Sequence, residues 1–153
     1  MPIRSFKQLL YEATWLGPKK VAIAAAANAE VLAAAAEAQR LGMAQCLLLD
    51  DPQKLATAAH EAGVDLQTMT LLPSAHPAEA AHTAMRLARQ GEVDAVMKGS
   101  LETAVLLKAA LDSDNGLRTG KLLTHVAVYE IPNFGRLLLL SDGGVVVAPD
   151  IYQ

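Results

Sequence analysis

A lysine, a glycine and two hydroxyl side chains follow one apolar run and open a helix-forming stretch. They are Lys98, Gly99, Ser100 and Thr103, and the run before them is 94–97. In open α/β sheets, ligands bind just beyond the carboxyl ends of the strands. A helix amino end favours anions because its first N–H groups lack intrahelical partners and carry partial positive charge. The spacing therefore allows a phosphate site, with Gly99 admitting the anion to the backbone and Lys98 adding charge. A helix capped by Ser100, with Lys98 in solvent, explains the residues equally well.

Two more loops carry polar residues between glycines. In 116–121, Gly-Leu-Arg-Thr-Gly-Lys, the cation Arg118 could face a ligand, although a solvated turn is the simpler interpretation. In 141–144, Ser-Asp-Gly-Gly, Asp142 could hold a cation, accept a ligand hydroxyl or form an Asx-turn, and the turn is the default interpretation.

Several familiar catalytic patterns do not occur in the sequence. There is no Walker A loop, no Gly-x-Gly-x-x-Gly fingerprint and no Gly-x-Ser-x-Gly elbow. The four histidines lack carboxylate or histidine partners at metal-ligand spacing, so we predict no metal site.

Short apolar runs alternate with helix-type stretches through the first two thirds of the chain. The predicted strands are 21–25, 46–49, 66–72 and 94–97, and the predicted helices are 29–41, 53–62, 76–90 and 101–111. This alternation with short links predicts an α/β fold, a three-layer sandwich with a mostly parallel sheet. Two later β-rich runs, 122–129 and 136–140, predict a C-terminal β-hairpin that adds antiparallel strands to that sheet.

Composition limits the class of protein. A chain of 153 residues, 52% hydrophobic and 19% charged, predicts one folded domain over residues 1–153. The net charge of -3 argues against nucleic-acid binding. The Ala-rich stretch 21–36 contains Asn28 and Glu30 and is too polar to span a membrane. The single cysteine, Cys46, lies in an apolar run and predicts a buried thiol in a reducing compartment, so we expect a cytoplasmic protein without a signal peptide.

Together the three loops resemble the phosphate acetyltransferase and butyryltransferase family, and most closely its butyryltransferase branch. The resemblance rests on ordered blocks at 94–103, 116–132, 140–145 and 148–150, which include Met-Lys-Gly, Leu-Arg-Thr-Gly and Ser-Asp-Gly-Gly. It implies transfer of an acyl group between coenzyme A and inorganic phosphate, directly and without an enzyme nucleophile. Acyl-CoA and phosphate would be the partners, with coenzyme A as substrate, no other cofactor, and a homo-oligomer as the usual assembly.

The same resemblance implies a two-domain α/β fold like that of isocitrate and isopropylmalate dehydrogenases, with the active site between the domains. On this interpretation the chain is the N-terminal domain without the second one, and is incomplete as an enzyme. The substrate- and phosphate-binding residues would be Lys98, Gly99, Ser100, Thr103, Arg118, Asp142 and Gly143, with the catalytic residues unknown. A non-catalytic phosphate- or CoA-binding module is the alternative, and a relative of the decarboxylating dehydrogenases ranks last because their metal-binding aspartates do not occur.

Overall fold

The computed structural model describes residues 2–146 and residue 150. Its contacts divide the chain into two compact units. The single domain expected over residues 1–153 stays a prediction. Unit 1 comprises Met1–Leu16 and Thr119–Gln153, and unit 2 comprises Gly17–Arg118. In the part of the chain that the structure describes, no helix is long and apolar enough to cross a bilayer.

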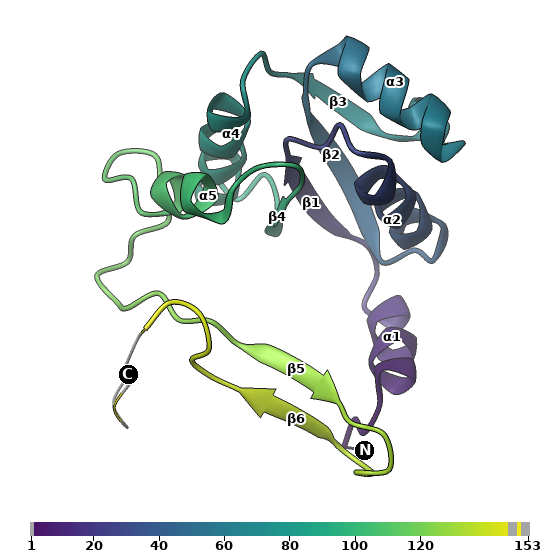
Figure 1. Cartoon of the computed structure of the whole chain (residues 1–153), viewed down its shortest axis with the longest axis vertical. Helices are drawn as coiled ribbons and strands as arrows, with labels where there is room; N and C mark the ends of the chain where they lie inside the picture. Colours follow the sequence, from purple (N-terminus) through teal and green to yellow (C-terminus); the bar gives the residue numbers. More distant parts are fainter. Residues whose placement is uncertain (1, 147–149, 151–153) are drawn as a thin grey trace. The chain divides into compact units, whose positions relative to one another are not determined.

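Unit 2 is built on a four-stranded parallel sheet (Figure 1). Its strands are β1 (Lys19–Ala24), β2 (Ala44–Asp50), β3 (Thr70–Pro73) and β4 (Ala95–Lys98). Their order is β3-β2-β1-β4, and Val21 of β1 pairs with Cys46 on one side and Ala95 on the other. The predicted parallel sheet is therefore confirmed.

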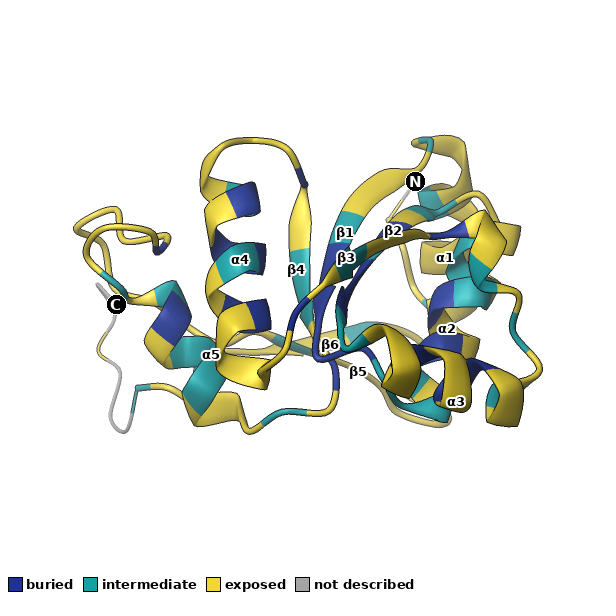
Figure 2. Cartoon of the chain, turned by 90° about the horizontal axis from the view of Figure 1, so that it is seen from above, coloured by how far each residue is buried: buried dark blue, intermediate teal, exposed yellow. Residues whose placement is uncertain are grey.

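Helices cover both faces of this sheet. They are α2 (Ala29–Arg40), α3 (Pro52–Ala62), α4 (Pro77–Arg89) and α5 (Thr103–Ala110). The buried side chains form two clusters: Ile23 and Leu48 pack with residues of α2 and α3, whereas Ala22, Ala24 and Leu49 pack with residues of α4 and α5. Because strand residues alternate between faces, one apolar run supplies both clusters. In Figure 2 the dark-blue residues of α4 lie on its side toward β4.

Local chemistry explains most helix starts. Asn28 caps α2 by accepting from Val31 N at 3.1 Å, and Asp51 caps α3 by accepting from Gln53 N and Lys54 N. The predicted third strand is wrong at its beginning, because Leu66–Thr68 forms a 3-10 turn whose cap is Asp65. The last helix begins at Thr103, two residues later than predicted, and its N-cap residue is Glu102.

Unit 1 contains helix α1 (Phe6–Trp15) and the strands β5 (Ala127–Glu130) and β6 (Leu137–Leu140). The two strands pair antiparallel, so the hairpin is confirmed. The prediction that it extends the parallel sheet is wrong, because β5 and β6 form a separate two-stranded sheet. A hairpin pattern indicates pairing between neighbouring strands but not the sheet edge they join, since every edge offers the same backbone groups.

Candidate functional site

The order of the parallel strands creates a switch point between β1 and β4. From β1 the chain passes through α2 to β2 on one side, and it returns through α4 to β4 on the other. The loops that leave the carboxyl ends of β1 and β4 therefore diverge to opposite faces of the sheet. Such a point is where open α/β sheets bind ligands.

A hollow of about 550 Å³ lies at this switch point and is called the β1–β4 hollow here. Residues from the start of α2 and from the loop after β4 line it: Asn28, Glu30, Val31, Lys98, Gly99, Ser100, Leu101 and Glu102. Three of the predicted site residues, Lys98, Gly99 and Ser100, thus meet in one concavity. Thr103, the first residue of α5, is exposed and is not among the lining residues.

The Lys98 ammonium is partly occupied by its own loop. Its Nζ donates to the carbonyl oxygen of Leu101 at 2.8 Å and lies 3.4 Å from that of Gly99. These bonds hold the cation over the hollow and leave one of its three N–H groups for a ligand oxygen. Glu30 and Glu102 also line the hollow, so its formal charge is negative unless a cation from elsewhere joins it.

The backbone N–H groups of this loop do not serve as predicted. Gly99 N donates to Ala24 O at 2.9 Å and Ser100 N donates to Ala25 O at 2.6 Å. Both amides tie the end of β4 to the end of β1 and are not free for a phosphate. The expectation that Gly99 opens the backbone to an anion, and the alternative that Ser100 caps the helix, both need correction.

Position 99 requires glycine because the backbone of β1 passes close to it, and not because an anion binds there. A Cβ added there would overlap the carbonyl oxygen of Ala25 and lie 2.9 Å from that of Ala24. Ala25 itself is buried and has φ +56°, a left-handed conformation that alanine rarely adopts. Hydrogen bonds hold it on both sides, from Ala25 N to Leu49 O and from Ser100 N to Ala25 O. Strained residues of this kind cluster at functional sites.

Asp50 is a site-shaping residue that sequence reasoning missed. It ends β2 and accepts from Ala27 N and from Asp51 N, both at 2.8 Å. Its carboxylate thus fixes the loop between β1 and α2, on which Asn28 and Glu30 stand. A signal for it was present in the sequence, since an acidic residue ends an apolar strand there.

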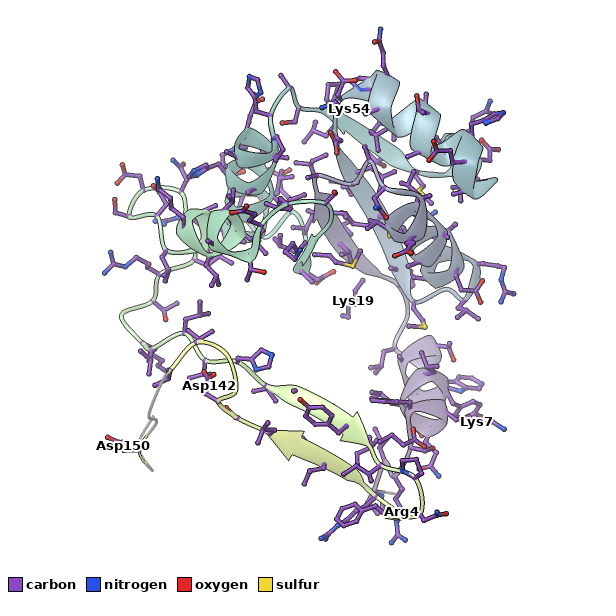
Figure 3. All side chains as sticks on the ribbon, in the orientation of Figure 1. Arg4, Lys7, Lys19, Lys54, Asp142 and Asp150 are labelled. Atoms are coloured by element: carbon purple, nitrogen blue, oxygen red, sulfur yellow. The ribbon has the colours of Figure 1, made fainter. Side chains whose placement is uncertain are left out.

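The remaining predicted site residues lie elsewhere. Arg118 is exposed and is the last residue of unit 2, outside the lining of the β1–β4 hollow. Asp142 and Gly143 belong to unit 1, in the loop after β6 (Figure 3). Ala148 and Pro149, part of the last block of the resemblance, lie outside the described residues.

The Asp142 carboxylate is engaged by its own chain. Oδ2 accepts from His125 N at 2.7 Å, and Oδ1 accepts from Gly144 N at 2.7 Å and from Val145 N at 2.8 Å. These backbone donors hold the pKa of Asp142 well below its ordinary range. Of the three roles considered for Asp142, the local turn is the one that this geometry supports, extended by a tether to the segment before β5.

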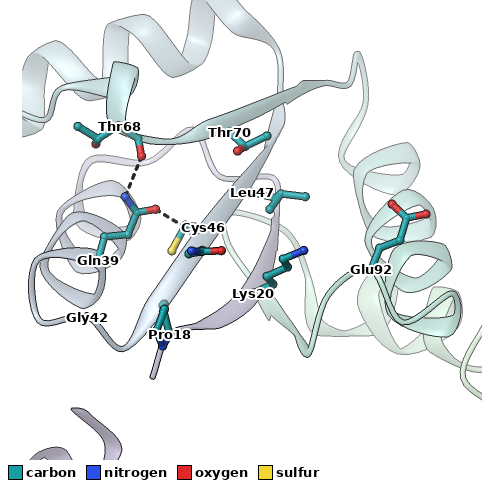
Figure 4. Close-up of a pocket in the computed structure, with 11 residues that line it drawn as sticks. Pro18, Lys20, Gln39, Gly42, Cys46, Leu47, Thr68, Thr70 and Glu92 are labelled. Carbon is teal, nitrogen blue, oxygen red and sulfur yellow. Dashed lines mark hydrogen bonds between the residues drawn. The ribbon is translucent and has the colours of Figure 1, made fainter. Parts of the chain in front are cut away.

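A second hollow, of about 630 Å³, lies at the opposite ends of the strands (Figure 4). Gln39 crosses it, donating to Thr68 O at 3.0 Å and accepting from Cys46 N at 2.8 Å. Cys46 is buried as predicted, and its burial raises the pKa of the thiol. No predicted site residue lines this hollow.

Comparisons with known proteins support the resemblance over nearly the whole chain. The phosphate butyryltransferase of Clostridium acetobutylicum is 35% identical over 151 residues, which are 99% of this chain and 50% of that protein. The phosphate acetyltransferase of Thermotoga maritima is 34% identical over 135 residues, 88% of this chain and 46% of that protein. This chain belongs to the phosphate acetyl- and butyryltransferase family and corresponds to an N-terminal part of its members.

Solved structures agree with this membership. A branched-chain phosphotransacylase from Enterococcus faecalis V583 superposes with a TM-score of 0.70 at 26% identity, covering 86% of this chain and 45% of that one. A phosphotransacetylase from Streptococcus pyogenes shares the fold, with a TM-score of 0.71 at 14% identity, over 88% of this chain and 50% of that one. No model of a protein family matches the chain. The chain spans about half the length of the curated relatives it matches.

Proposed function

We propose that this chain forms the half of a phosphate acyltransferase that contains the switch point between β1 and β4. Such an enzyme transfers an acyl group between coenzyme A and inorganic phosphate. The observation that carries the proposal is the 35% identity to a phosphate butyryltransferase along 99% of the chain, together with Lys98 at the β1–β4 hollow. Acyl-CoA and phosphate would be the substrates, in the cytoplasm and in a homo-oligomer. A second domain, in an arrangement like that of isocitrate dehydrogenase, would complete the site.

Within this proposal Lys98 binds and orients an anionic oxygen of the substrate. Its ammonium is fixed by the Leu101 and Gly99 carbonyls, so little side-chain freedom is lost when a ligand binds. A fixed cation stabilises the charge that develops on the acyl or phosphoryl oxygen more than it stabilises the ground state. Ser100 would add a hydroxyl beside it. The carboxylates of Glu30 and Glu102 oppose a phosphate, so this role requires a further cation, for which Arg118 is our candidate.

A chimera tests the proposal. The matched half of the Clostridium acetobutylicum phosphate butyryltransferase is replaced by this chain, and thiol release from butyryl-CoA is followed with phosphate present. We expect turnover, and we expect Lys98→Ala to lower kcat/KM by roughly 100-fold, the scale of losing one fixed donor to a developing charge. The 153-residue chain alone is expected to show little or no turnover.

Lys108→Ala is the matched control, because Lys108 is an exposed lysine of α5 outside the hollow. If both lysine variants keep full activity, Lys98 has no role in the reaction. A folded chimera that binds phosphate or coenzyme A without turnover would favour the alternative, a non-catalytic binding module. Circular dichroism and a thermal melt establish that each variant is folded.

A further inference from the structure

Unit 1 exposes many large apolar side chains, called the unit 1 apolar surface here. The set comes from α1, from the hairpin and from the segments beside it: Ile3, Phe6, Leu9, Leu10, Tyr11, Trp15, Leu16, Leu122, Leu123, Val126, Val128, Tyr129, Ile131, Phe134, Leu138, Leu139, Leu140 and Val145. Single exposed leucines are ordinary on a protein surface, but so large a gathering in a small unit is typical of an interaction site.

The hairpin is apolar on both of its faces. Its register places Val128 opposite Leu139 and Tyr129 opposite Leu138, and successive residues point to opposite faces. All four side chains are exposed, and Leu139 has an exposed fraction of 66%. Strands that are apolar on both faces are typical of sheets covered on both sides. Because a two-stranded sheet is marginally stable alone, more chain is needed to cover this one.

Helix α1 also presents an apolar stripe without a cover. Phe6, Leu9 and Leu10 follow helical spacing, yet none of the ten residues of α1, all of them described, is buried. The helix start is tied to the hairpin, since Phe6 N donates to Glu130 Oε2 at 2.6 Å. A hollow of about 700 Å³ beside its first turns is lined by Ile3 and Tyr11 among others. The helix and hairpin thus offer their apolar side chains within one unit.

We propose that the unit 1 apolar surface is the docking surface for a folded polypeptide equivalent to the half of the phosphate butyryltransferases that this chain does not match. The relatives are about twice as long as the match. About half of each of these relatives therefore lies outside the match. Unit 2 has no comparable uncovered apolar surface, because its sheet is covered by its own helices on both faces. The proposal goes beyond acyl transfer and does not depend on it.

Hydrogen exchange tests the proposal on the full chain and on the chimera described above. We expect the amides of α1, β5 and β6 to exchange at least about tenfold more slowly in the chimera, whereas those of β1 change little. Leu139→Glu should leave the melting temperature of the chain alone unchanged, since that side chain has few contacts, and should lower that of the chimera. Leu71→Glu is the matched control, because Leu71 is an exposed strand leucine of unit 2.

Three results would overturn the proposal. Unchanged exchange of the hairpin in the chimera would show that the surface stays open. Protection in the chain alone, with a dimer measured by light scattering, would assign the surface to a second copy. Protection in the monomeric chain would mean that the chain covers its own surface.

If the chimera does not fold, the two halves are expressed together as separate chains, and they should co-purify unless Leu139→Glu is present. An inactive chimera with a protected hairpin would refute only the proposed function.

Discussion

Replacing Gly99 with alanine tests how closely β4 ends against β1. The new Cβ would overlap the Ala25 carbonyl oxygen and lie 2.8 Å from the Ala25 carbonyl carbon and 2.9 Å from the Ala24 oxygen. These are backbone atoms, so the clash is relieved only if the strand end moves. That movement stretches two hydrogen bonds, from Gly99 N to Ala24 O and from Ser100 N to Ala25 O.

The magnitude follows from these contacts. Overpacking a tight site costs about 1–3 kcal/mol, and each weakened hydrogen bond loses up to about 1 kcal/mol. We therefore expect Gly99→Ala to lower the free energy of unfolding of unit 2 by roughly 2–4 kcal/mol, a large part of the total for a domain. Hydrogen exchange of the Ile23 and Leu48 amides, in the buried strands, measures this loss.

Gly143→Ala is the matched control. A Cβ at Gly143 would meet only the Leu140 and His125 side chains, at 3.5 Å and 3.7 Å, which are ordinary contacts. We expect Gly143→Ala to change the free energy of unfolding by less than about 0.5 kcal/mol. Equal stability of the two variants would refute the reasoning, because it would mean that β4 does not approach β1 as closely as the structure shows.

Three further predictions concern Asp142, Cys46 and Leu48. Asp142→Asn should speed amide exchange at His125 and Val145, because an amide cannot accept on both sides. Because the pKa of Asp142 is lowered in the folded chain, its carboxylate stabilises the folded state fully above its ordinary pKa, about pH 4, and this stabilisation is lost as the pH falls from there toward the lowered pKa; the Asn variant should lose this pH dependence. Cys46 should react with a thiol reagent only as fast as unit 2 opens, since burial shields the thiol and raises its pKa; rapid labelling of the folded chain would contradict this. Leu48→Ala should destabilise unit 2 by about 2–5 kcal/mol in urea unfolding, because Leu48 is fully buried between β1, α2 and α3.

The helices and strands of unit 2 were predictable because their signals are local. Apolar runs that are buried on both faces predict parallel strands, and residues such as Asn28 and Asp51 bond to amides two or three positions away. Helix α1 carried a similar signal, Ser5 followed three positions later by Gln8. The backbone N–H of Gln8 donates to the Ser5 hydroxyl at 3.2 Å. That helix was predictable and was missed.

The candidate site was predictable only in part. The sequence placed Lys98 at the carboxyl end of a strand, and the structure places it in the β1–β4 hollow. It could not reveal that the Gly99 and Ser100 amides are already bonded, because their acceptors lie on a strand far earlier in the chain. The same holds for Asp142, which accepts from His125 across the hairpin.

The amino-acid sequence by itself determined the alternation of strands and helices, the parallel sheet, the buried thiol and the family to which the chain belongs. Each of these depends on residue type and on spacing along the chain. The tertiary structure alone decided which strands are neighbours at the switch point, why residue 99 must be glycine and that the hairpin forms a sheet of its own. The physical reason is that these features arise from contacts between distant segments, which hydrogen-bond through backbone groups that are the same in nearly every residue.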